Sequence, residues 1–482
     1  MWKIGIPGVC RGPLQYTDTS SSQQKEQRTH RMRTPEPKIQ QPPPPSQRFL
    51  KMIKIKNPTT MKQQKQIVQA KNTHMNEHPP EEDVMEMLLV LPDEIVLEIF
   101  SWLPATAIQK FKSASDFFRT MPFEERYFVL KQSHNALLRK DPCFFLQPNS
   151  CKKYSAINEF HHFLSEKTSS GVPHNFLKFL ENYPACRILA SSNGLILGCS
   201  TKKNNQTELF ISNPSTQSWF LIPTLNHLKE YPDSEINVAF ECNSKDFMLF
   251  LFEVPAEWAS SCYIVKLYSQ EEGMWKSIEK TFFTGTRRMM FDTYVFQNNV
   301  FHVISDCFPY LHKKSPYFRP YIMAYTIEDG ESRMLRVPKE ARRGSHDLSC
   351  KMGIYKWGKV TSLDGSMCLV RLRKCVFTIW VLTDYKSCKW KRVLKIRVRA
   401  MGIIEEEPII VKGFIVMNGD CLVFATKKKV YSYGLSRENY RVVEEISEHG
   451  FDDDEVYFTC YSDTLRLCGE GATTLPLLQQ SY

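Results

Sequence analysis

The sequence predicts a multidomain α+β chain in which a disordered N-terminal tail precedes a small all-α module and a mainly-β domain of propeller type. Three features predict this organisation: a basic low-complexity start, two short amphipathic helical patterns, and a long region of short β-type runs separated by turn signals. A chain of 482 residues is also too long for one ordinary core. The expected boundaries are 1–80 for the tail, 81–121 for the helical module, 122–183 for a mainly helical connector, 184–468 for the β domain and 469–482 for a C-terminal tail.

Residues 1–80 carry almost all of the net charge of the chain. They hold 14 Lys and Arg against four acidic residues, a net charge of +10, whereas the whole chain has +11. Residues 35–47 and 61–71 are rich in Pro, Gln or Lys and too poor in apolar side chains to offset the entropy of ordering, so we expect disorder. Scattered charges without interleaved aromatic residues favour a solvated linker over a nucleic-acid-binding arm. In an alternative interpretation the true start is Met75 or Met85, close to the helical module.

The cysteine pattern argues against a metal site and against disulfides. The chain has 15 cysteines, an odd number, and the closest two are Cys368 and Cys375, so no CxxC spacing occurs. We therefore expect small buried thiols in a reducing compartment, and no metal or cofactor. No apolar run approaches the roughly 18 residues needed to cross a bilayer, so we expect no membrane association.

The helical module begins at a proline. Pro92 suits the first turn of a helix, where its missing N–H would be unpaired in any case. Ile95, Ile99 and Leu103 then recur every four residues and form an apolar stripe. Pro104 interrupts this pattern and starts a second helix. Neither helix is long enough to be stable alone in water, so the two must pack on other elements.

These residues resemble the F-box, the module that docks on the Skp-type adaptor of SCF ubiquitin ligases. Leu91-Pro92 and Leu103-Pro104 match its two Leu-Pro pairs without a gap, whereas Asp116 stands where Lys is usual and Phe118 where Trp is usual. The resemblance implies a Skp-type adaptor and, through it, a cullin as partners. The adaptor contacts that it implies are Leu91, Pro92, Ile95, Ile99, Leu103, Pro104, Ile108 and Phe111. The alternative is a helical hairpin that belongs to some other domain.

The region from about residue 184 contains two recurring signals. The first is the tight-turn dipeptide of a β-hairpin, found at Asn193-Gly194, Asn298-Asn299, Asp364-Gly365 and Asn418-Gly419. The second is a strand, a polar turn and a large residue that opens another strand, with that residue at Trp219, Trp275, Met334, Trp390 and Tyr440. The intervals of 56, 59, 56 and 50 residues between these markers predict four-stranded propeller blades, five to seven in number. A β-sandwich of irregular hairpins is the alternative.

This region resembles the F-box-associated, kelch-like propellers of plant F-box proteins. Ser191–Leu195 reads SSNGL and Asn213–Trp219 reads NPSTQSW, two motifs common in that family, whereas the kelch double glycine is absent from the chain. The resemblance implies the substrate-recognition subunit of an SCF-type ubiquitin ligase, acting in ubiquitin-dependent degradation in the cytoplasm, the nucleus or both. The alternative function is a propeller scaffold for protein binding outside any ligase.

An enzyme is not expected. The sequence contains no Gly-rich phosphate loop, GxSxG elbow or HExxH motif, so we assign no catalytic residue. Specificity for an unidentified protein substrate is expected in the longer loops, at 226–235, 253–261, 306–320 and 339–349. The residues that we expect to contact the substrate, aromatic anchors and arginines suited to an acidic or phosphorylated partner, are Trp258, Tyr310, Tyr317, Arg319, Tyr321, Arg342 and Arg343.

Overall fold

The computed structural model describes residues 91–138, 143–148, 159–162, 187–201, 207–223, 236–242, 246–254, 261–308, 313–345, 347, 349–358, 366–405, 408–435, 443–451, 455–469 and 473–474. All of them belong to the unit Glu81–Tyr482. The expected tail at 1–80 lies outside the described residues, and so does the turn expected at Asp364-Gly365.

Four short helices form the N-terminal part of the described chain. They are α4 (Asp93–Phe100), α5 (Ala105–Ala114), α6 (Asp116–Thr120) and α7 (Arg126–Ala136). Pro92 immediately precedes α4, and its carbonyl accepts hydrogen bonds from the amides of Ile95 and Val96. Pro104 likewise immediately precedes α5. Pro92 and Pro104 therefore mark the two helix starts that the sequence predicts. We call residues 91–138 the helical module. The described part of the β domain also has two short helices, α9 (Lys339–Arg342) and the 3-10 helix η4 (Val398–Met401).

The strands of the described chain form six antiparallel sheets. Five are built from consecutive strands. The first has β3 (Arg187–Ser192), β4 (Leu195–Thr201), β5 (Thr207–Asn213) and β6 (Ser218–Leu221), with β25 (Thr473–Thr474) at its outer edge. The second has β7 (Asn237–Cys242), β8 (Phe247–Glu253), β9 (Cys262–Ser269) and β10 (Met274–Ser277), with β11 (Phe282–Phe283) on β9. The third has β12 (Met289–Gln297), β13 (Val300–Ser305), β14 (Tyr321–Thr326) and β15 (Ser332–Arg336).

The remaining sheets complete the set. The fourth has β16 (Lys351–Trp357), β17 (Ser366–Arg373), β18 (Val376–Asp384) and β19 (Lys389–Arg397). The fifth has β20 (Gly413–Met417), β21 (Cys421–Ala425), β22 (Lys429–Gly434) and β23 (Val443–Glu448). The sixth joins β24 (Val456–Tyr461) to β1 (Cys143–Pro148) and β2 (Glu159–His162).

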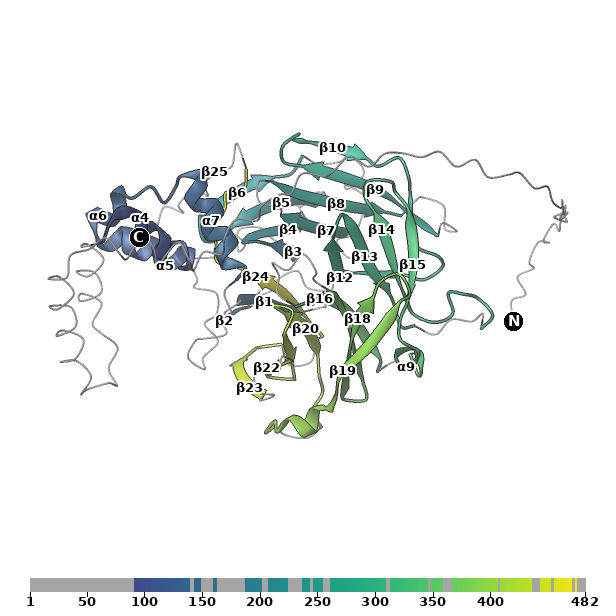
Figure 1. The fold of residues 1–482 in the computed structure, drawn as a ribbon. Helices are drawn as coiled ribbons and strands as arrows, with labels where there is room; N and C mark the ends of the chain where they lie inside the picture. The colour runs from purple at the N-terminus through teal and green to yellow at the C-terminus, as the bar shows by residue number, and fades with distance from the viewer. Residues whose placement is uncertain are drawn as a thin grey trace, which may run out of the picture. The chain divides into compact units, whose positions relative to one another are not determined.

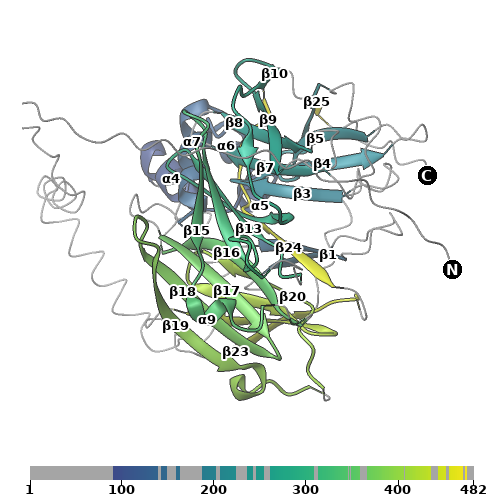
Figure 2. The same ribbon diagram turned by 90° about the vertical axis from the view of Figure 1, so that its right-hand side faces the viewer.

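The sheets are the blades of a propeller. The first strands of successive sheets contact one another, in the order β3, β7, β12, β16, β20 and β24, and β24 contacts β3 again. In Figure 1 these strands gather toward the middle, whereas β6, β10, β15, β19 and β23 lie outside. Figure 2 likewise places β24 and β16 between the outer strands β10 and β23. The prediction of a propeller is confirmed, with five complete blades and a three-stranded sheet that closes the ring.

Within the described residues, the tight turns and the large residues that follow polar turns lie at the places in the blades that the sequence predicts. Asn193, Asn298 and Asn418 each have a positive φ and connect the first two strands of a blade. Trp219, Trp275 and Trp390 are each the second residue of a fourth strand and Met334 is the third residue of one, whereas the marker Tyr440 lies outside the described residues. The indole N–H of Trp275 donates to Pro223 O at 2.8 Å and that of Trp390 to Arg336 O at 3.0 Å, so these two residues link neighbouring blades.

The connector differs from the sequence prediction. We expected residues 122–183 to be mainly helical, but after α7 the described part consists of the strands β1 and β2. Phe144, Phe145 and Leu146 are fully buried, and they pair with β24 from the other end of the domain. A short apolar run of this kind is ambiguous between helix and strand, and its distant partner decides the outcome. The propeller therefore begins at residue 143.

One buried histidine makes the stability of this domain depend on pH. His302, in β13, contacts Val295 O at 3.1 Å and the Tyr385 hydroxyl at 2.9 Å. Burial lowers the pKa of His302 from 6.5 to about 4, against the opposing effect of its backbone hydrogen bonds. The unfolded chain therefore takes up this proton first as the pH falls, and stability is lost progressively between about pH 6.5 and about pH 4.

We predict that His302→Gln flattens this acid dependence. When the pH is lowered from about 7.5 to about 5, protonation of His302 in the unfolded chain should reduce the unfolding free energy of the natural protein by about 2 kcal/mol. The variant should lack this contribution. Urea unfolding at the two pH values measures the difference. His134→Gln, at an exposed position of α7, is the control. Equal losses in the natural chain and in His302→Gln would contradict the assignment.

Candidate functional site

An aromatic cluster holds the helical module together. Phe100 of α4 lies at the centre, with ring centroids 5.0 Å from Phe118, 5.1 Å from Phe111 and 5.1 Å from Phe123. Phe118, the residue that stands in place of the usual Trp, is fully buried and stacks on Phe100. The aromatic character of the position is thus used in packing, and α4, α5 and α6 form one core.

The other side of α4 exposes large apolar side chains. Ile95 is 43% exposed, Ile99 40% and Trp102 45%. Ile95 and Ile99 lie one turn apart on α4, and Trp102 lies in the turn that follows the helix, three residues after Ile99. Trp102 was not among the residues expected to contact an adaptor, although its distance of seven residues from Ile95 was a usable signal. We call Ile95, Ile99 and Trp102 the exposed face of α4.

The other residues expected to contact an adaptor vary in exposure. Pro92 is exposed, and Leu91, Leu103, Pro104 and Phe111 are half-buried. Ile108 is fully buried inside the module, among Val96, Phe100 and Phe118. The expectation that Ile108 contacts a partner is therefore wrong for this conformation. It follows Pro104 by one helical turn, a position that faces α4 and α6 and not solvent.

A buried carboxylate joins the helical module to the propeller. Asp463 follows β24, and its Oδ2 accepts from the Thr106 amide at 3.2 Å and from the Thr106 hydroxyl at 2.6 Å. Its Oδ1 accepts from the Ser215 hydroxyl, which also lies 2.7 Å from the Tyr461 hydroxyl. One carboxylate thus satisfies donors at the start of α5 and in the β5–β6 turn. Gln109 of α5 adds a hydrogen bond to Ser215 O.

Gln132 provides a second polar link at the same junction. Its side chain is fully buried, and its amide nitrogen donates to Leu103 O at 2.9 Å and to Asp463 O at 3.2 Å. Its carbonyl accepts from the Leu465 amide at 3.0 Å. Both ends of the amide are therefore paired, as a buried polar group requires. We call residues 461–466 the C-terminal strap, because they lie between the helical module and the first blade.

The two sequence motifs of the first blade hold the C-terminal strap from the other side. Asn213 is fully buried and donates to Thr464 O at 2.8 Å and to Arg466 O at 2.6 Å. In the amide orientation that satisfies both neighbours, Asn193 donates to Ser133 O at 3.0 Å and accepts from Arg466 at 3.1 Å. Gly194 has φ +85°, and a Cβ there would overlap the Thr464 side chain. The Asn-Gly pair is therefore required by the turn and by the close approach of the strap.

The expected substrate loops emerge on the opposite face. In an antiparallel meander, successive connections alternate between the two faces of a blade. The β3–β4 and β5–β6 turns meet the helical module, so they define what we call the module face. The β13–β14 and β15–β16 connections, which include 306–320 and 339–349, lie on the distal face. The strand ends that flank 226–235 and 253–261 point to the distal face as well, although those two loops lie largely outside the described residues.

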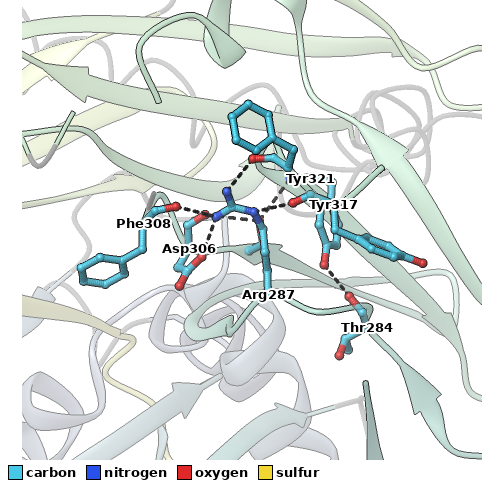
Figure 3. Close-up of polar contacts among 8 residues, drawn as sticks. Thr284, Arg287, Asp306, Phe308, Tyr317 and Tyr321 are labelled. Carbon is cyan, nitrogen blue, oxygen red and sulfur yellow. Dashed lines mark hydrogen bonds and ion pairs between the residues drawn. The ribbon is translucent and has the colours of Figure 1, made fainter. Parts of the chain in front are cut away.

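A buried arginine organises the first of these loops. The Arg287 side chain is fully buried, and Figure 3 shows its guanidinium surrounded by loop acceptors. It forms an ion pair with Asp306 at 2.8 Å and donates to Tyr317 O at 2.8 Å and Phe318 O at 2.7 Å. Phe308 O accepts at 3.1 Å. A buried cation with this many acceptors fixes both ends of the loop, because moving either end would leave charge unpaired.

A second arginine holds the neighbouring loop. Arg371 of β17 donates from one nitrogen to Glu340 O at 2.8 Å, Ala341 O at 3.1 Å and Arg343 O at 3.2 Å. Its guanidinium carbon lies 5.4 Å from the ring centre of Trp380. The two loops also contact each other, since Arg319 donates to Arg342 O at 3.0 Å. The structure therefore brings 306–320 and 339–349 together.

The expected substrate contacts divide into three groups. Arg319 and Arg343 are exposed, and Tyr317 and Arg342 are half-buried. Tyr321 is only 2% exposed and donates to Thr284 O at 2.6 Å, as Figure 3 also shows, so its assignment to substrate binding is wrong. It is the first residue of β14 and faces the core, an orientation that depends on strand register. Trp258 and Tyr310 lie outside the described residues.

Comparison with known proteins identifies the family. Residues 143–465 match the F-box associated beta propeller domain. The chain is also 23% identical over 360 residues to F-box protein At5g49610 of Arabidopsis thaliana, which covers 71% of this chain and 88% of the relative. The chain belongs to the F-box-associated β-propeller family of plant F-box proteins. F-box protein At5g07610 of the same plant is 24% identical over 201 residues, 39% of this chain and 44% of that protein.

Solved structures show weaker similarity. TolB from Acinetobacter baumannii aligns over 66% of this chain and 66% of its own length, with a TM-score of 0.38 and 11% identity. The Dos1 propeller aligns over 62% of this chain and 67% of its own length, with a TM-score of 0.31 and 10% identity.

The matched family domain includes the propeller side of the junction with the helical module. The matched domain starts at β1 and ends inside the C-terminal strap, so it contains Ser215, Asp463 and Leu465, which bond to α5 and α7 of the F-box module. Among the described residues, no group of three or more His, Cys, Asp or Glu side chains is arranged to hold a metal ion. No described helix is long and apolar enough to cross a membrane.

We predict that Asp463→Ala loosens the F-box module. The change leaves the buried Ser215 hydroxyl and the donors of Thr106 without their acceptor, which should cost about 1–3 kcal/mol of unfolding free energy. Urea unfolding measures the stability, and amide hydrogen exchange at the start of α5 locates the change. Asp116→Ala removes an exposed ion pair with Arg119 and should produce no measurable change. Unchanged exchange in α5 would show that Asp463 does not hold the module.

Proposed function

We propose that this protein is the substrate-recognition subunit of an SCF-type ubiquitin ligase. In this proposal the F-box module binds a Skp-type adaptor and, through it, a cullin, and the propeller binds the protein to be ubiquitinated. The protein itself is non-catalytic and acts in the cytoplasm, the nucleus or both, where free cysteines are stable. The family membership supports the receptor role, and the single observation that carries the adaptor contact is the exposed face of α4.

The exposed face of α4 has the composition of a partner contact. Ile95 and Ile99 on α4 and Trp102 in the turn after it are 40–45% exposed, so a partner could bury three large apolar side chains at one place. Pro92 lies beside them and is also exposed. The aromatic core behind this face, centred on Phe100, keeps α4 in place when the face is covered.

The two proposed binding surfaces are held apart by a stiff junction. The F-box contacts the module face through buried, hydrogen-bonded polar groups, and the candidate substrate loops emerge on the distal face. A receptor of this kind increases the rate of ubiquitin transfer by proximity, since it holds a substrate lysine near the charged conjugating enzyme. A rigid junction keeps that spacing constant, which favours an effectively intramolecular transfer.

A propeller scaffold outside any ligase is the second candidate. The same distal loops would serve it, but the exposed face of α4 would then have no partner. Co-purification of an adaptor therefore separates the two functions.

We predict that the double change Ile95→Ala and Ile99→Ala abolishes co-purification of a Skp-type adaptor without unfolding the protein. Each side chain is outside the module core, so the unfolding free energy should stay nearly unchanged, whereas losing a central anchor commonly costs roughly 2 kcal/mol or more of binding, about thirtyfold in affinity. Tyr127→Ala, exposed on α7, is the matched control. Retained binding at micromolar adaptor would rule out this contact.

We also predict that charge reversal on the distal face changes the captured substrates. Arg319→Glu with Arg343→Glu alters two exposed cations on adjoining loops, so proteins that bind through acidic or phosphorylated segments should be lost. Affinity capture with the Ile95 and Ile99 changes present retains substrates that would otherwise be degraded. Arg397→Glu, exposed on β19, is the control. An unaltered set of captured proteins would show that these loops do not bind substrate.

A further inference from the structure

Two phenylalanine rings are exposed on the distal face, beside the loop that Arg287 holds. Phe308 is 64% exposed and Phe283 is 44% exposed. Phe283 is the second residue of β11, and strand alternation directs its neighbour Phe282 into the core and Phe283 away from it. Tyr317 is half-buried next to Phe283, with the two ring centres 6.3 Å apart. We call Phe283, Phe308 and Tyr317 the aromatic surface of the distal face.

The backbone beneath this aromatic surface is fixed. Arg287 donates from Nε to Tyr317 O at 2.8 Å and from one terminal nitrogen to Phe308 O at 3.1 Å, so one buried guanidinium holds both residues. Figure 3 shows the Phe308 ring directed away from that guanidinium. The Tyr317 ring lies directly on Gly285, where a Cβ would be 2.5 Å from it. The aromatic side chains are therefore presented by an ordered backbone, and a partner would not have to order it.

The loops 306–320 and 339–349 carry an excess of positive charge. Their described residues include three acids and six cations, the latter being Lys313, Lys314, Arg319, Lys339, Arg342 and Arg343. Each acid already forms an ion pair with an arginine outside the two loops: Asp306 with Arg287, Glu340 with Arg392, and Asp347 with Arg373. The acids of the loops are thus neutralised by these arginines, and the positive charge of the loop cations remains available to a partner.

Aromatic side chains and cations occur together in the same loop. The guanidinium carbon of Arg319 lies 5.0 Å from the ring centre of Phe318, and Lys313 and Lys314 are exposed a few residues before Tyr317. Exposed aromatic residues on ordered backbone are typical of the anchors that dominate protein interfaces, and the cations select an acidic partner. Single-stranded nucleic acid also uses aromatic rings and cations, but it needs a groove of cations that follows its backbone. Here the cations are gathered on two adjoining loops, which favours a short protein segment.

We propose that the aromatic surface and the loop cations bind a short acidic protein segment that carries one large apolar side chain. The apolar side chain packs on Phe283, Phe308 and Tyr317, and the carboxylates of the segment pair with Lys313, Lys314 and the other loop cations. Carboxylates alone supply the charge, so the segment needs no phosphate group. The inference rests on the proposed function, because it states which class of segment the receptor recognises in its substrate.

The test begins with selection of binding peptides from a phage-displayed library of random, unphosphorylated peptides, with the purified full chain as bait. The enriched peptides should combine a large apolar residue with several acidic residues close to it. Enrichment of basic peptides, of peptides without a large apolar residue, or of no peptide at all would overturn the proposal. This step uses the natural chain and therefore does not depend on the folding of any variant.

The most enriched peptide, synthesised with a fluorescent label, then locates the site by anisotropy titration. The double change Phe283→Ala and Phe308→Ala should weaken its binding by roughly tenfold or more. The melting temperature should stay nearly unchanged, because Phe308 binds Arg287 through its backbone carbonyl and both rings are exposed. Met274→Ala, 57% exposed at the module-face end of β10, is the matched control. Equal affinity in the natural chain and in the folded double variant would show that the aromatic surface does not bind the peptide.

Charge reversal tests the cations separately. Lys313→Glu with Lys314→Glu should weaken peptide binding severalfold at low salt and make it less dependent on salt concentration. A labelled oligonucleotide of dT should bind the natural chain more weakly than the peptide, and tighter binding of the oligonucleotide would overturn the choice of a protein partner. Adaptor co-purification is measured separately. A chain that binds the peptide but no adaptor contradicts the ligase assignment alone, whereas one that binds an adaptor but no such peptide contradicts this inference alone.

Discussion

β1 pairs with β24 in antiparallel register, from Cys143 opposite Tyr461 to Pro148 opposite Val456, and this pairing closes the ring of sheets. Apart from β25 at the edge of the first sheet, the other described sheets are made of consecutive strands, so this sheet is where a strand from the start of the domain is paired along its whole length with one from the end. The entropy of closing so long a loop is offset by burying Phe144, Phe145 and Leu146. Because α7 leads into β1 and the C-terminal strap leaves β24, the same closure also brings the helical module to the propeller.

The junction that results is polar and buried, which makes it specific. Asp463, Gln132 and Asn213 together pair groups from α5, α7, the first blade and the strap, and each of these three side chains is at most 7% exposed. A buried polar network stabilises one arrangement strongly, since any shift leaves donors or acceptors without partners. The family motifs SSNGL and NPSTQSW are thereby explained: Asn193 and Asn213 bind the strap, and Gly194 leaves room for it.

The distal face is held together by buried arginines instead of by a network centred on a buried carboxylate. There, Arg287 and Arg371 are buried cations whose hydrogen bonds go mostly to backbone carbonyls of the connections between strands, so these long connections acquire fixed ends. Exposed Arg319 and Arg343 remain on loops held this way. Pre-ordered loops lose less entropy on binding a partner.

The sequence by itself determined the elements whose cause is local. Pro92 and Pro104 set the helix starts, Asn193, Asn298 and Asn418 set left-handed turns, and the spacing of the large residues after polar turns revealed the blades. A turn at Lys374 and Cys375 has the same positive φ but no such signal, and was missed. Only the tertiary structure decided that Ile108 and Tyr321 are buried, that residues 143–148 are a strand, and that Asp463 and Arg287 organise the two faces. Each of these depends on partners distant in the chain, which local patterns of charge and hydrophobicity do not specify.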